Sequence, residues 1–294
     1  MPGGNVQVII RKREEGKVRV ACHGITWGRE NFDQAVVDIG DMGFAGVETF
    51  ASVIDDFGFE RVDEFGDLLR SRGMQLVGLY GGGDMHDPSK FEMVVANNVR
   101  IARFLQLNGA ERLVLGPGRR PAQGPTRDDL LNLAHCASEI GRRTLEYGVQ
   151  ACLHPHVHTV VETIPEIDFV FDRVDPRYVA MAADTAHFAK GNPDVPGAEV
   201  DLFSKYADRI KYVHLKDWDP ELPAEAVGVG GTAVIRDFVE LGEGRVNLAA
   251  CIEALRQQGY DGWLTIELDY TRRTPVESVQ MSKVYLEREL GLSV

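Results

Sequence analysis

The stretch MQLVGLYGGGDMHDPSKFEMVVANNVRIARFLQLNGAERLVLGPG (74–118) decides the fold of this chain. Both of its ends, 74–83 and 111–118, are short apolar runs that close in glycine, as buried strands often do. The intervening segment 88–109 carries apolar residues at helical spacing and is stopped by Gly109. The pattern predicts a strand, a helix and a second strand.

Units of the same kind run from one end of the sequence to the other, with no linker between them. Strands are expected at 18–27, 46–50, 74–83, 111–118, 149–156, 178–187, 209–217 and 262–270. Helices are expected at 32–43, 59–72, 88–109, 126–148, 163–174, 197–207, 247–258 and 275–290.

Eight alternating strand–helix units predict an α/β fold in which an all-parallel sheet closes into a (β/α)₈ TIM barrel. A doubly wound open sheet is the alternative. That fold usually places GxGxxG after its first strand, whereas this chain has HGITWG (23–28) there. We expect residues 1–16 to be an N-terminal extension and residues 17–294 to form a single barrel domain.

An insertion of mixed glycine, proline and acidic residues occupies about 218–241. We expect it to fold over the active site as a cap or to contact another subunit. Its glycine-rich centre, VGVGG (227–231), lacks the GK[ST] ending of a phosphate-binding loop. The segment is therefore interpreted as a mobile lid.

The composition indicates an acidic protein whose partner is a small molecule. Its net charge is −13, and a nucleic-acid partner would need clustered Lys and Arg, so none is expected. No apolar run is long enough to span a bilayer and no signal peptide is evident, so no membrane partner is expected. The four cysteines are widely spaced, without a CxxC pair, which fits reduced thiols and a cytoplasmic location.

Polar side chains gather where the predicted strands end. Seven of the eight histidines lie at or just after a strand end, and only His135 lies in a predicted helix, where we expect a structural role. Because the active site of a barrel forms at the C-terminal ends of its strands, this clustering predicts a catalytic site. The polar residues at these ends are His23, Trp27, Glu48, Tyr80, Asp84, His86, His154, His156, Asp184, His187, His214, Lys216, Asp217, Glu267 and Asp269.

Three of these residues form a candidate metal site. Asp184, His214 and Glu267 come from three different strand ends. Carboxylate, imidazole and carboxylate ligands suit Mn²⁺, Mg²⁺, Co²⁺ or Zn²⁺ and leave open positions for a substrate. The alternative interpretation is local: Asp184 would cap the next helix, and His214 would form a hydrogen-bonded pair with Asp217.

Several blocks resemble the xylose-isomerase-like TIM-barrel superfamily, and within it the inosose (2-keto-myo-inositol) dehydratases. The resemblance covers nearly the whole chain; it is specific for the fold and the metal site and less so for the substrate. Catalytic subunits of C-glycoside deglycosidases are also similar. The blocks are ACHGITW (21–27), VETF (47–50), HPHVHTVVET (154–163), MAADTAH (181–187), YVHLKDWD (212–219) and LGEGRVNLAACIEALRQQGYDGWLTIELD (241–269).

The resemblance implies a divalent metal, with Mn²⁺ or Co²⁺ expected first, held by Asp184, His214, Glu267 and one further carboxylate. Related isomerases place a Glu at the end of the fifth strand, whereas this chain has His154 there. We expect Glu162 to be the fourth ligand, since hard metal ions favour carboxylates. His154 is the alternative.

With Glu162 on the metal, His154 and His156 would share one side of an extended strand and be free for acid–base catalysis. We expect one of them to remove a proton beside a substrate ketone. The other, or His187, would protonate the leaving hydroxyl. For His158 we expect a surface role.

The expected activity is that of a metal-dependent lyase that enolises a keto-sugar or keto-cyclitol and then eliminates water. A C-glycoside deglycosidase subunit acting on 3-oxo-glycosides and a sugar isomerase or epimerase are the alternatives. The substrate ring is expected to contact His23, Trp27, Glu48 and Lys216. The resemblance also implies an oligomer, which in the deglycosidase case would include a small second subunit.

Overall fold

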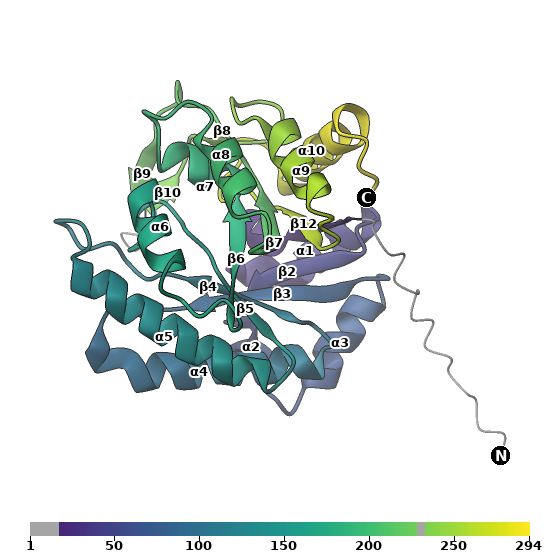
Figure 1. Cartoon of the computed structure of the whole chain (residues 1–294). Coiled ribbons are helices and arrows are strands. Elements are labelled where there is room, and N and C mark those ends of the chain that lie inside the picture. The colour runs from purple at the N-terminus through teal and green to yellow at the C-terminus, as the bar shows by residue number, and fades with distance from the viewer. Residues whose placement is uncertain (1–17, 228–232) are drawn as a thin grey trace, which may run out of the picture.

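The computed structural model describes residues 18–227 and 233–294, so the expected N-terminal extension lies outside the described residues. Eight parallel strands close into a barrel in chain order, with the last strand pairing with the first (Figure 1). This confirms the predicted (β/α)₈ fold. The barrel strands are β1 (Arg19–His23), β2 (Gly46–Phe50), β3 (Gln75–Gly82), β4 (Arg112–Gly116), β5 (Gln150–Leu153), β6 (Val179–Asp184), β7 (Ile210–Leu215) and β12 (Trp263–Ile266).

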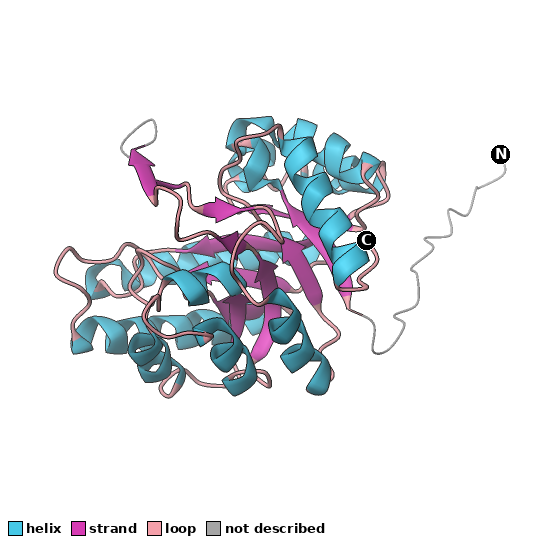
Figure 2. Ribbon diagram, turned by 90° about the horizontal axis from the view of Figure 1, so that it is seen from above, coloured by secondary structure: helices cyan, strands magenta, loops and turns pink. Residues whose placement is uncertain are grey.

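Helices surround the barrel, as the view from above shows (Figure 2). Two short helices were not predicted: α2 after β2, and α7 directly after β6. The helices are α1 (Phe32–Asp41), α2 (Val53–Phe57), α3 (Val62–Arg70), α4 (Phe91–Leu107), α5 (Arg127–Leu145), α6 (Ile164–Phe171), α7 (Thr185–Lys190), α8 (Ala198–Lys205), α9 (Leu248–Gln257) and α10 (Pro275–Glu289).

Strand alternation divides the core into two parts. Successive side chains of a strand point to opposite faces, so every second residue enters the barrel and the others pack against the helices. The barrel interior holds a small cluster, while a larger apolar layer lies between strands and helices. The interior cluster consists of Ala21, Val77, Val114, Cys152, Ala180, Ala182, Tyr212 and Trp263.

Four predicted strands were too long by three or more residues at their C-terminal ends. β1 stops at His23, β5 at Leu153, β6 at Asp184 and β12 at Ile266. After β5, Pro155 has no N–H to donate to a neighbouring strand. After β6, the Asp184 carboxylate accepts two backbone N–H groups and starts α7 at once. His187 is therefore a helical residue, and the expectation that only His135 lies in a helix was wrong.

The insertion between β7 and α9 consists of two antiparallel ribbons. One pairs β8 (Asp217–Trp218) with β11 (Phe238–Val239), and the other pairs β9 (Glu225–Val227) with β10 (Ala233–Ile235). The second ribbon projects from the rim of the barrel (Figure 2). Most of the predicted glycine-rich lid centre lies outside the described residues.

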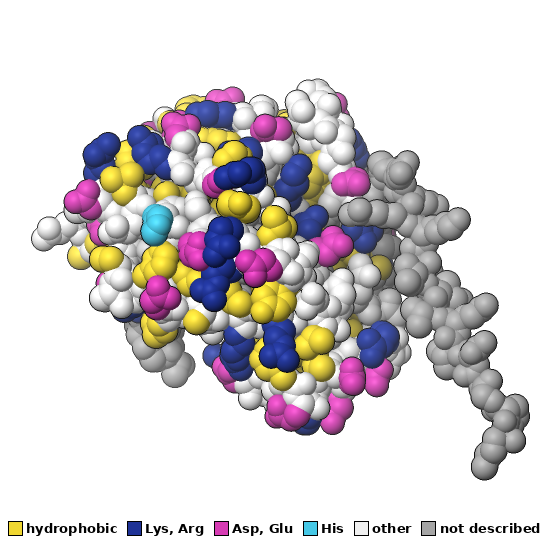
Figure 3. Space-filling view, turned by 60° about the horizontal axis from the view of Figure 1, so that its bottom comes forward, with side chains coloured by type: hydrophobic (Ala, Val, Ile, Leu, Met, Phe, Trp, Pro, Cys, Tyr) yellow, Lys and Arg dark blue, Asp and Glu magenta, His cyan; other side chains and the backbone are white. Residues whose placement is uncertain are grey.

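The outer surface mixes side chains of all kinds. On the face shown in Figure 3, Lys and Arg side chains are interspersed with Asp, Glu and hydrophobic ones. Within residues 18–227 and 233–294, no helix is both long enough and apolar enough to cross a membrane.

Candidate active site

The alternation of the strands carries polar side chains into the mouth of the barrel. Asp184 follows Ala182 on the inward face of β6, and His214 follows Tyr212 on the inward face of β7. The register of the two strands sets Asp184 beside His214. The next inward positions of β5 and β12 are His154 and Glu267, each one residue past the end of its strand.

At this end of the barrel, His23 Nε2 and Glu48 Oε1 on the β1–β2 side have no hydrogen-bond partner among the described residues. The same holds for one atom of each of four side chains on the side of β5, β6, β7 and β12: His154 Nε2, Asp184 Oδ2, His214 Nδ1 and Glu267 Oε2. Ligand atoms of the first three lie within 4.8 Å of one another. Glu267 Oε2 lies 2.7 Å from His214 Nδ1, without hydrogen-bond alignment. All four residues are buried.

In His154, Asp184 and His214, the other polar atom of the side chain contacts a group of the protein that fixes its orientation. His154 Nδ1 lies 3.1 Å from the carbonyl oxygen of Ala182, and His214 Nε2 lies 2.8 Å from Glu48 Oε2. With a proton on the held nitrogen, each ring would present a lone pair on the other nitrogen to a metal ion. Asp184 Oδ1 accepts two backbone N–H groups at the start of α7, at 2.9 and 2.8 Å.

This arrangement fits a divalent metal ion. Buried polar atoms normally find partners, and leaving one without a partner costs about 1–3 kcal/mol. Two imidazole nitrogens and two carboxylate oxygens form a donor set that first-row divalent ions accept. Partners that fix the far side of each ligand are also typical of metal sites.

Glu48 is placed behind His214. Its Oε2 accepts the Tyr212 hydroxyl at 2.8 Å as well as the His214 ring, and Tyr212 in turn accepts the Thr265 hydroxyl at 2.8 Å. Its Oε1 is 3.9 Å from His23 Nε2. Glu48 therefore orients His214. Tyr212 and Thr265 were missed in the sequence, although each lies two residues before a predicted ligand and so on the same face of its strand.

Glu162 is not among the four residues with converging atoms. Its carboxylate lies 3.4 Å from Arg120 Nε, and the same guanidinium also bonds Glu166. Backbone geometry separates it from the cluster: the chain turns after Pro155, and the N–H of His156 bonds the carbonyl of Val161. The expected fourth ligand, Glu162, thus lies beside Arg120, whereas the alternative, His154, is one of the clustered residues.

His156 and His187 lie next to the cluster. Their rings are 3.6 Å apart between centroids, and each ring is 5.5 Å from that of His154. Burial, and then the positive charge of Lys216, lower the pKa of His156 to about 4. His187 Nε2 lies 3.3 Å from Lys216 Nζ, and the ring of Phe238 from the insertion packs edge-on against His187 at 4.9 Å.

Lys216 is a fully buried cation surrounded by acids. Its Nζ lies 2.7 Å from Asp269, 3.5 Å from Glu267 and 3.7 Å from Asp184. Burial lowers its pKa, but these three carboxylates outweigh that effect and raise the pKa above its usual value. Lys216 is therefore held as an ammonium group at the edge of the cluster.

Two other predicted substrate contacts lie on the β1 side. His23 is fully buried, and its Nδ1 accepts the N–H of Ile25 at 2.9 Å, which leaves Nε2 facing Glu48. The indole N–H of Trp27 donates to Asp38 on α1 at 2.7 Å, and Trp27 belongs to the core between strands and helices. The polar atom of Trp27 is thus committed to α1.

A cleft of about 770 Å³ lies over the ends of β3, β4 and β5. His156 lines it, so the cleft meets the cluster at that ring, and Ile235 of the insertion forms part of its wall. Glycines let the β3 and β4 ends approach closely: a Cβ on Gly116 would lie 2.5 Å from the Tyr80 hydroxyl, and one on Gly118 would lie 2.8 Å from the carbonyl oxygen of Gly83. The lining residues are Tyr80, Gly81, Gly83, Gly116, Gly118, Arg119, Arg120, Pro121, Ala122, His156, Val157, His158, Thr159 and Ile235.

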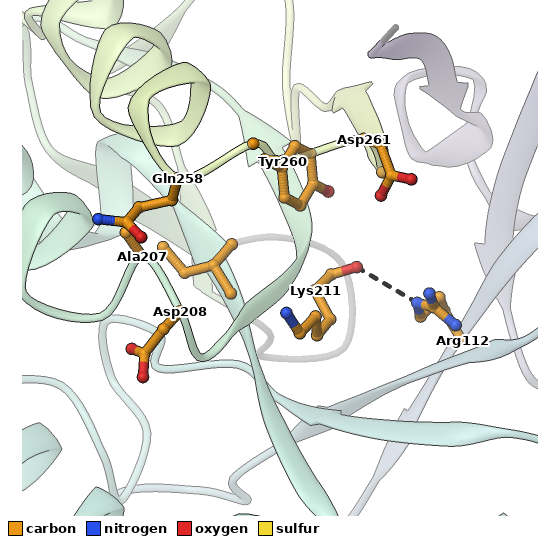
Figure 4. Close-up of a pocket in the computed structure, with 10 residues that line it drawn as sticks. Arg112, Ala207, Asp208, Lys211, Gln258, Tyr260 and Asp261 are labelled. Carbon is orange, nitrogen blue, oxygen red and sulfur yellow. Dashed lines mark hydrogen bonds between the residues drawn. The ribbon is translucent and has the colours of Figure 1, made fainter. Parts of the chain in front are cut away.

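A second cavity of about 260 Å³ lies at the opposite end of the barrel (Figure 4). It is formed where β4, β7 and β12 begin, and Arg112 there donates to the carbonyl of Lys211 at 3.2 Å. Barrel enzymes carry their active sites at the C-terminal ends of the strands. The catalytic candidate is therefore the cleft beside His156.

Comparison with known proteins assigns this barrel to a family. The model of the family described as "Xylose isomerase-like TIM barrel" matches residues 36–286. The chain belongs to the xylose isomerase-like TIM-barrel family. This confirms the family resemblance read from the sequence.

Curated relatives within the family are named inosose dehydratase. The protein from Lacticaseibacillus casei is 28% identical over 220 residues, which cover 69% of this chain and 72% of that protein. The protein from Clostridium botulinum (strain Alaska E43 / Type E3) is 24% identical over 309 residues, covering 94% and 98%. The names of these relatives agree with the lyase activity predicted from the sequence.

A solved structure of similar fold is that of the IOLI protein with a binding zinc atom. It matches with a TM-score of 0.73 at 16% identity, and the match covers 92% of this chain and 97% of that one. At this level of identity the likeness concerns the fold of the family.

Proposed function

We propose that this protein is a divalent-metal-dependent dehydratase acting on a keto-cyclitol or keto-sugar. One observation carries the proposal. Ligand atoms of His154, Asp184 and His214 lie within 4.8 Å of one another at the C-terminal mouth of the barrel, and Glu267 Oε2 lies 2.7 Å from His214. Each of the four has an atom without a hydrogen-bond partner among the described residues, and His156 beside them lines a cleft. The relatives named inosose dehydratase support the reaction and the substrate class.

We assign the metal to His154, Asp184, His214 and Glu267, in place of the Glu162 assignment that the sequence favoured. Mn²⁺ is the proposed native ion, because the two carboxylates suit it and the two imidazoles do not exclude it. When bound, the ion would stabilise negative charge on the carbonyl oxygen of the substrate. Glu48 acts as a positioning residue that keeps the His214 lone pair aimed at the metal site.

His156 is the proposed base. It is the histidine beside the cluster that also lines the cleft, so it can reach a proton on the carbon next to the ketone. As the C–H bond breaks, its electron pair forms a carbon–carbon double bond and the bond to the β-hydroxyl breaks. The hydroxyl leaves as water with a proton returned by the His156–His187 pair, whose rings are in contact.

Lys216 and His23 are proposed to bind substrate oxygens. Lys216 offers N–H donors at the edge of the cluster, and His23 Nε2 has no hydrogen-bond partner among the described residues. Glu48 and Trp27 stay predicted substrate contacts. Glu48 Oε2 is used by His214 and Tyr212, but its Oε1 has no hydrogen-bond partner among the described residues. The indole N–H of Trp27 donates to Asp38, so Trp27 offers only its apolar ring face.

The experiment that tests the function is incubation of metal-loaded protein with scyllo-inosose and a panel of 3-oxo-glycosides, read by mass. Loss of 18 Da is the expected result, since elimination releases water. Loss of an aglycone would identify a deglycosidase, and conversion without a change in mass would identify an isomerase or epimerase. Unchanged substrates throughout would reject the enzymatic proposal.

We also propose a cytoplasmic location and an oligomeric state. The four cysteines are buried and unpaired, which fits a reducing compartment. Size-exclusion chromatography with light scattering tests the oligomer, and a small co-purifying second chain would support the deglycosidase alternative.

A further inference from the structure

The lining of the cleft beside His156 contains arginine and histidine, although the protein is strongly acidic. Four of its lining residues are Arg or His, and no Asp or Glu is among the described residues that line it. The whole chain has 45 acidic residues against 32 Lys and Arg. The lining therefore differs in composition from the rest of the molecule. The basic lining residues are Arg119, Arg120, His156 and His158.

The two arginines play different parts. The Arg120 guanidinium bonds both carboxylate oxygens of Glu166 at 3.0 and 2.7 Å and lies 3.4 Å from Glu162, so its charge is already matched. Arg119 is exposed, and within the described residues its guanidinium has no ion-pair partner. The nearby acid, Asp84, meets only the backbone N–H of Arg119, at 3.4 Å, and pairs with Lys90 at 2.6 Å.

His158 is held in a strained conformation on the opposite side of the cleft loop. Among the described residues it is the one non-glycine with a positive φ, +64°. Such a conformation costs about 1–3 kcal/mol and persists where surrounding bonds impose it. Here the carbonyl of His158 accepts the N–H of Arg120 at 3.1 Å, and the guanidinium of Arg120 bonds the carbonyl of Thr159 at 3.1 Å. Arg120 thereby fixes the loop that carries His158 into the cleft.

We propose that the cleft selects substrates that carry an anionic group, a carboxylate or a phosphate, in addition to the ketone. Arg119 binds the anion beside the loop that carries His158, and His156, which lines the same cleft, faces the carbon chain. A guanidinium without a partner is the group best suited to pair with a carboxylate or phosphate. This inference rests on the proposed function and specifies its substrate class as acidic keto-sugars or keto-cyclitols.

The kinetic test compares substrates that differ only in charge. The metal-loaded enzyme is given methyl 3-oxo-glucoside, the matching 3-oxo-glucuronide and the 3-oxo-glucoside 6-phosphate, with scyllo-inosose as a neutral reference. Consumption of each keto compound is followed by mass. We expect kcat/KM to be at least tenfold higher for one or both anions, since charge-assisted hydrogen bonds exceed neutral ones by about that factor. The two anions separate a carboxylate site from a phosphate site.

Two variants locate the preference. Arg119→Gln removes the charge at an exposed position and should lower kcat/KM for the anions about tenfold while leaving the neutral substrates unchanged. His158→Gly removes the ring while suiting the positive φ and should keep the anion preference, which places that preference on Arg119. Arg70→Gln, on the exposed face of α3, is the matched control and should change neither.

A binding measurement separates this inference from the proposed function. Calorimetry with glucuronate, glucose 6-phosphate and glucose needs no turnover, and an anion preference that Arg119→Gln abolishes would support the site. Turnover of the neutral substrates with no preference in either measurement would overturn the anion site and leave the dehydratase standing. An anion preference in binding without turnover of any substrate would overturn the dehydratase and retain the anion site. Equal loss for charged and neutral substrates in Arg119→Gln also contradicts the inference.

Discussion

At the residue scale, the metal proposal depends on which atoms are already occupied. His154 uses Nδ1 on the carbonyl of Ala182 and keeps Nε2 without a partner, whereas the Glu162 carboxylate is paired with Arg120. A ligand must offer a lone pair at the point where the others meet. By that criterion His154 qualifies and Glu162 does not.

The first prediction concerns these two residues. His154→Ala should lower the metal content of purified protein at least tenfold, because it removes one of four ligands. Glu162→Ala should keep stoichiometric metal, and it serves as the matched control because it lies in the same segment. The measurement is metal analysis by mass spectrometry after dialysis against a metal buffer. Metal loss in Glu162→Ala with retention in His154→Ala would reverse the assignment.

Part of this site could be predicted from the sequence. Asp184, His214 and Glu267 stand at strand ends that hydrophobic periodicity can place, and the structure brings them together. The fourth proposed ligand could not be chosen from the sequence, because the choice between His154 and Glu162 depends on where the chain turns after Leu153. The competing partner of Glu162, Arg120, is 42 residues earlier in the sequence, and no local pattern connects the two.

At the scale of single elements, the start of α6 links the cleft loop to the barrel wall. Glu166 in its first turn accepts the backbone N–H groups of Glu162 and Thr163, at 3.0 and 2.9 Å, and pairs with Arg120. One carboxylate therefore caps the helix and anchors the guanidinium that holds His158. The Glu166 carboxylate therefore links the conformation of the loop that carries His158 to the start of α6.

The second prediction follows from the pKa of Glu166. Burial raises this pKa, but Arg120 and two backbone N–H groups outweigh burial and hold it below the ordinary 4.5. A carboxylate with a lowered folded-state pKa stabilises the fold above its unfolded pKa and loses that effect as pH falls. Glu166→Gln should cost about 1.5–3 kcal/mol at pH 7, and the difference from wild type should narrow below pH 4.5.

Urea unfolding at pH 7 and near pH 3.5 measures this difference. Glu139→Gln on α5 is the matched control, since that residue pairs with Arg142 on an exposed helix face and should cost less than about 1 kcal/mol. A cost for Glu166→Gln that stays constant with pH would show that its charge is not the cause.

Element boundaries show where sequence information ends. β2 was predicted with its observed bounds because GVETF is an isolated apolar run, and most helices were found within a few residues of their glycine stops. The predicted ends of β1, β5, β6 and β12 were too late, because the polar residues that follow these strands continue the alternation. β5 ends before Pro155, which has no N–H to donate to a neighbouring strand. β6 ends at Asp184, whose carboxylate accepts the first N–H groups of α7.

At the scale of the whole molecule, the proposed metal site joins strands from one half of the barrel. Its four residues lie on β6 and β7 or directly after β5 and β12, and these strands are consecutive around the barrel wall. Without an ion, four buried donor atoms have no partner among the described residues, which opposes close packing of these strand ends. Metal binding should therefore stabilise the fold as well as enable catalysis.

The last prediction is that removing the metal lowers the melting temperature. An ion that binds only the folded state adds about 2.7 kcal/mol when its free concentration is 100 times Kd. For a chain of this size that corresponds to a shift of several °C, on the order of 2–4 °C per kcal/mol. Differential scanning fluorimetry of EDTA-treated protein, before and after addition of Mn²⁺, Co²⁺, Zn²⁺ or Mg²⁺, ranks the ions by the shift they restore. His154→Ala combined with Glu267→Gln should show no shift with any ion, while Glu162→Gln should respond as wild type does. A restored shift in the double variant would place the stabilising ion elsewhere in the molecule.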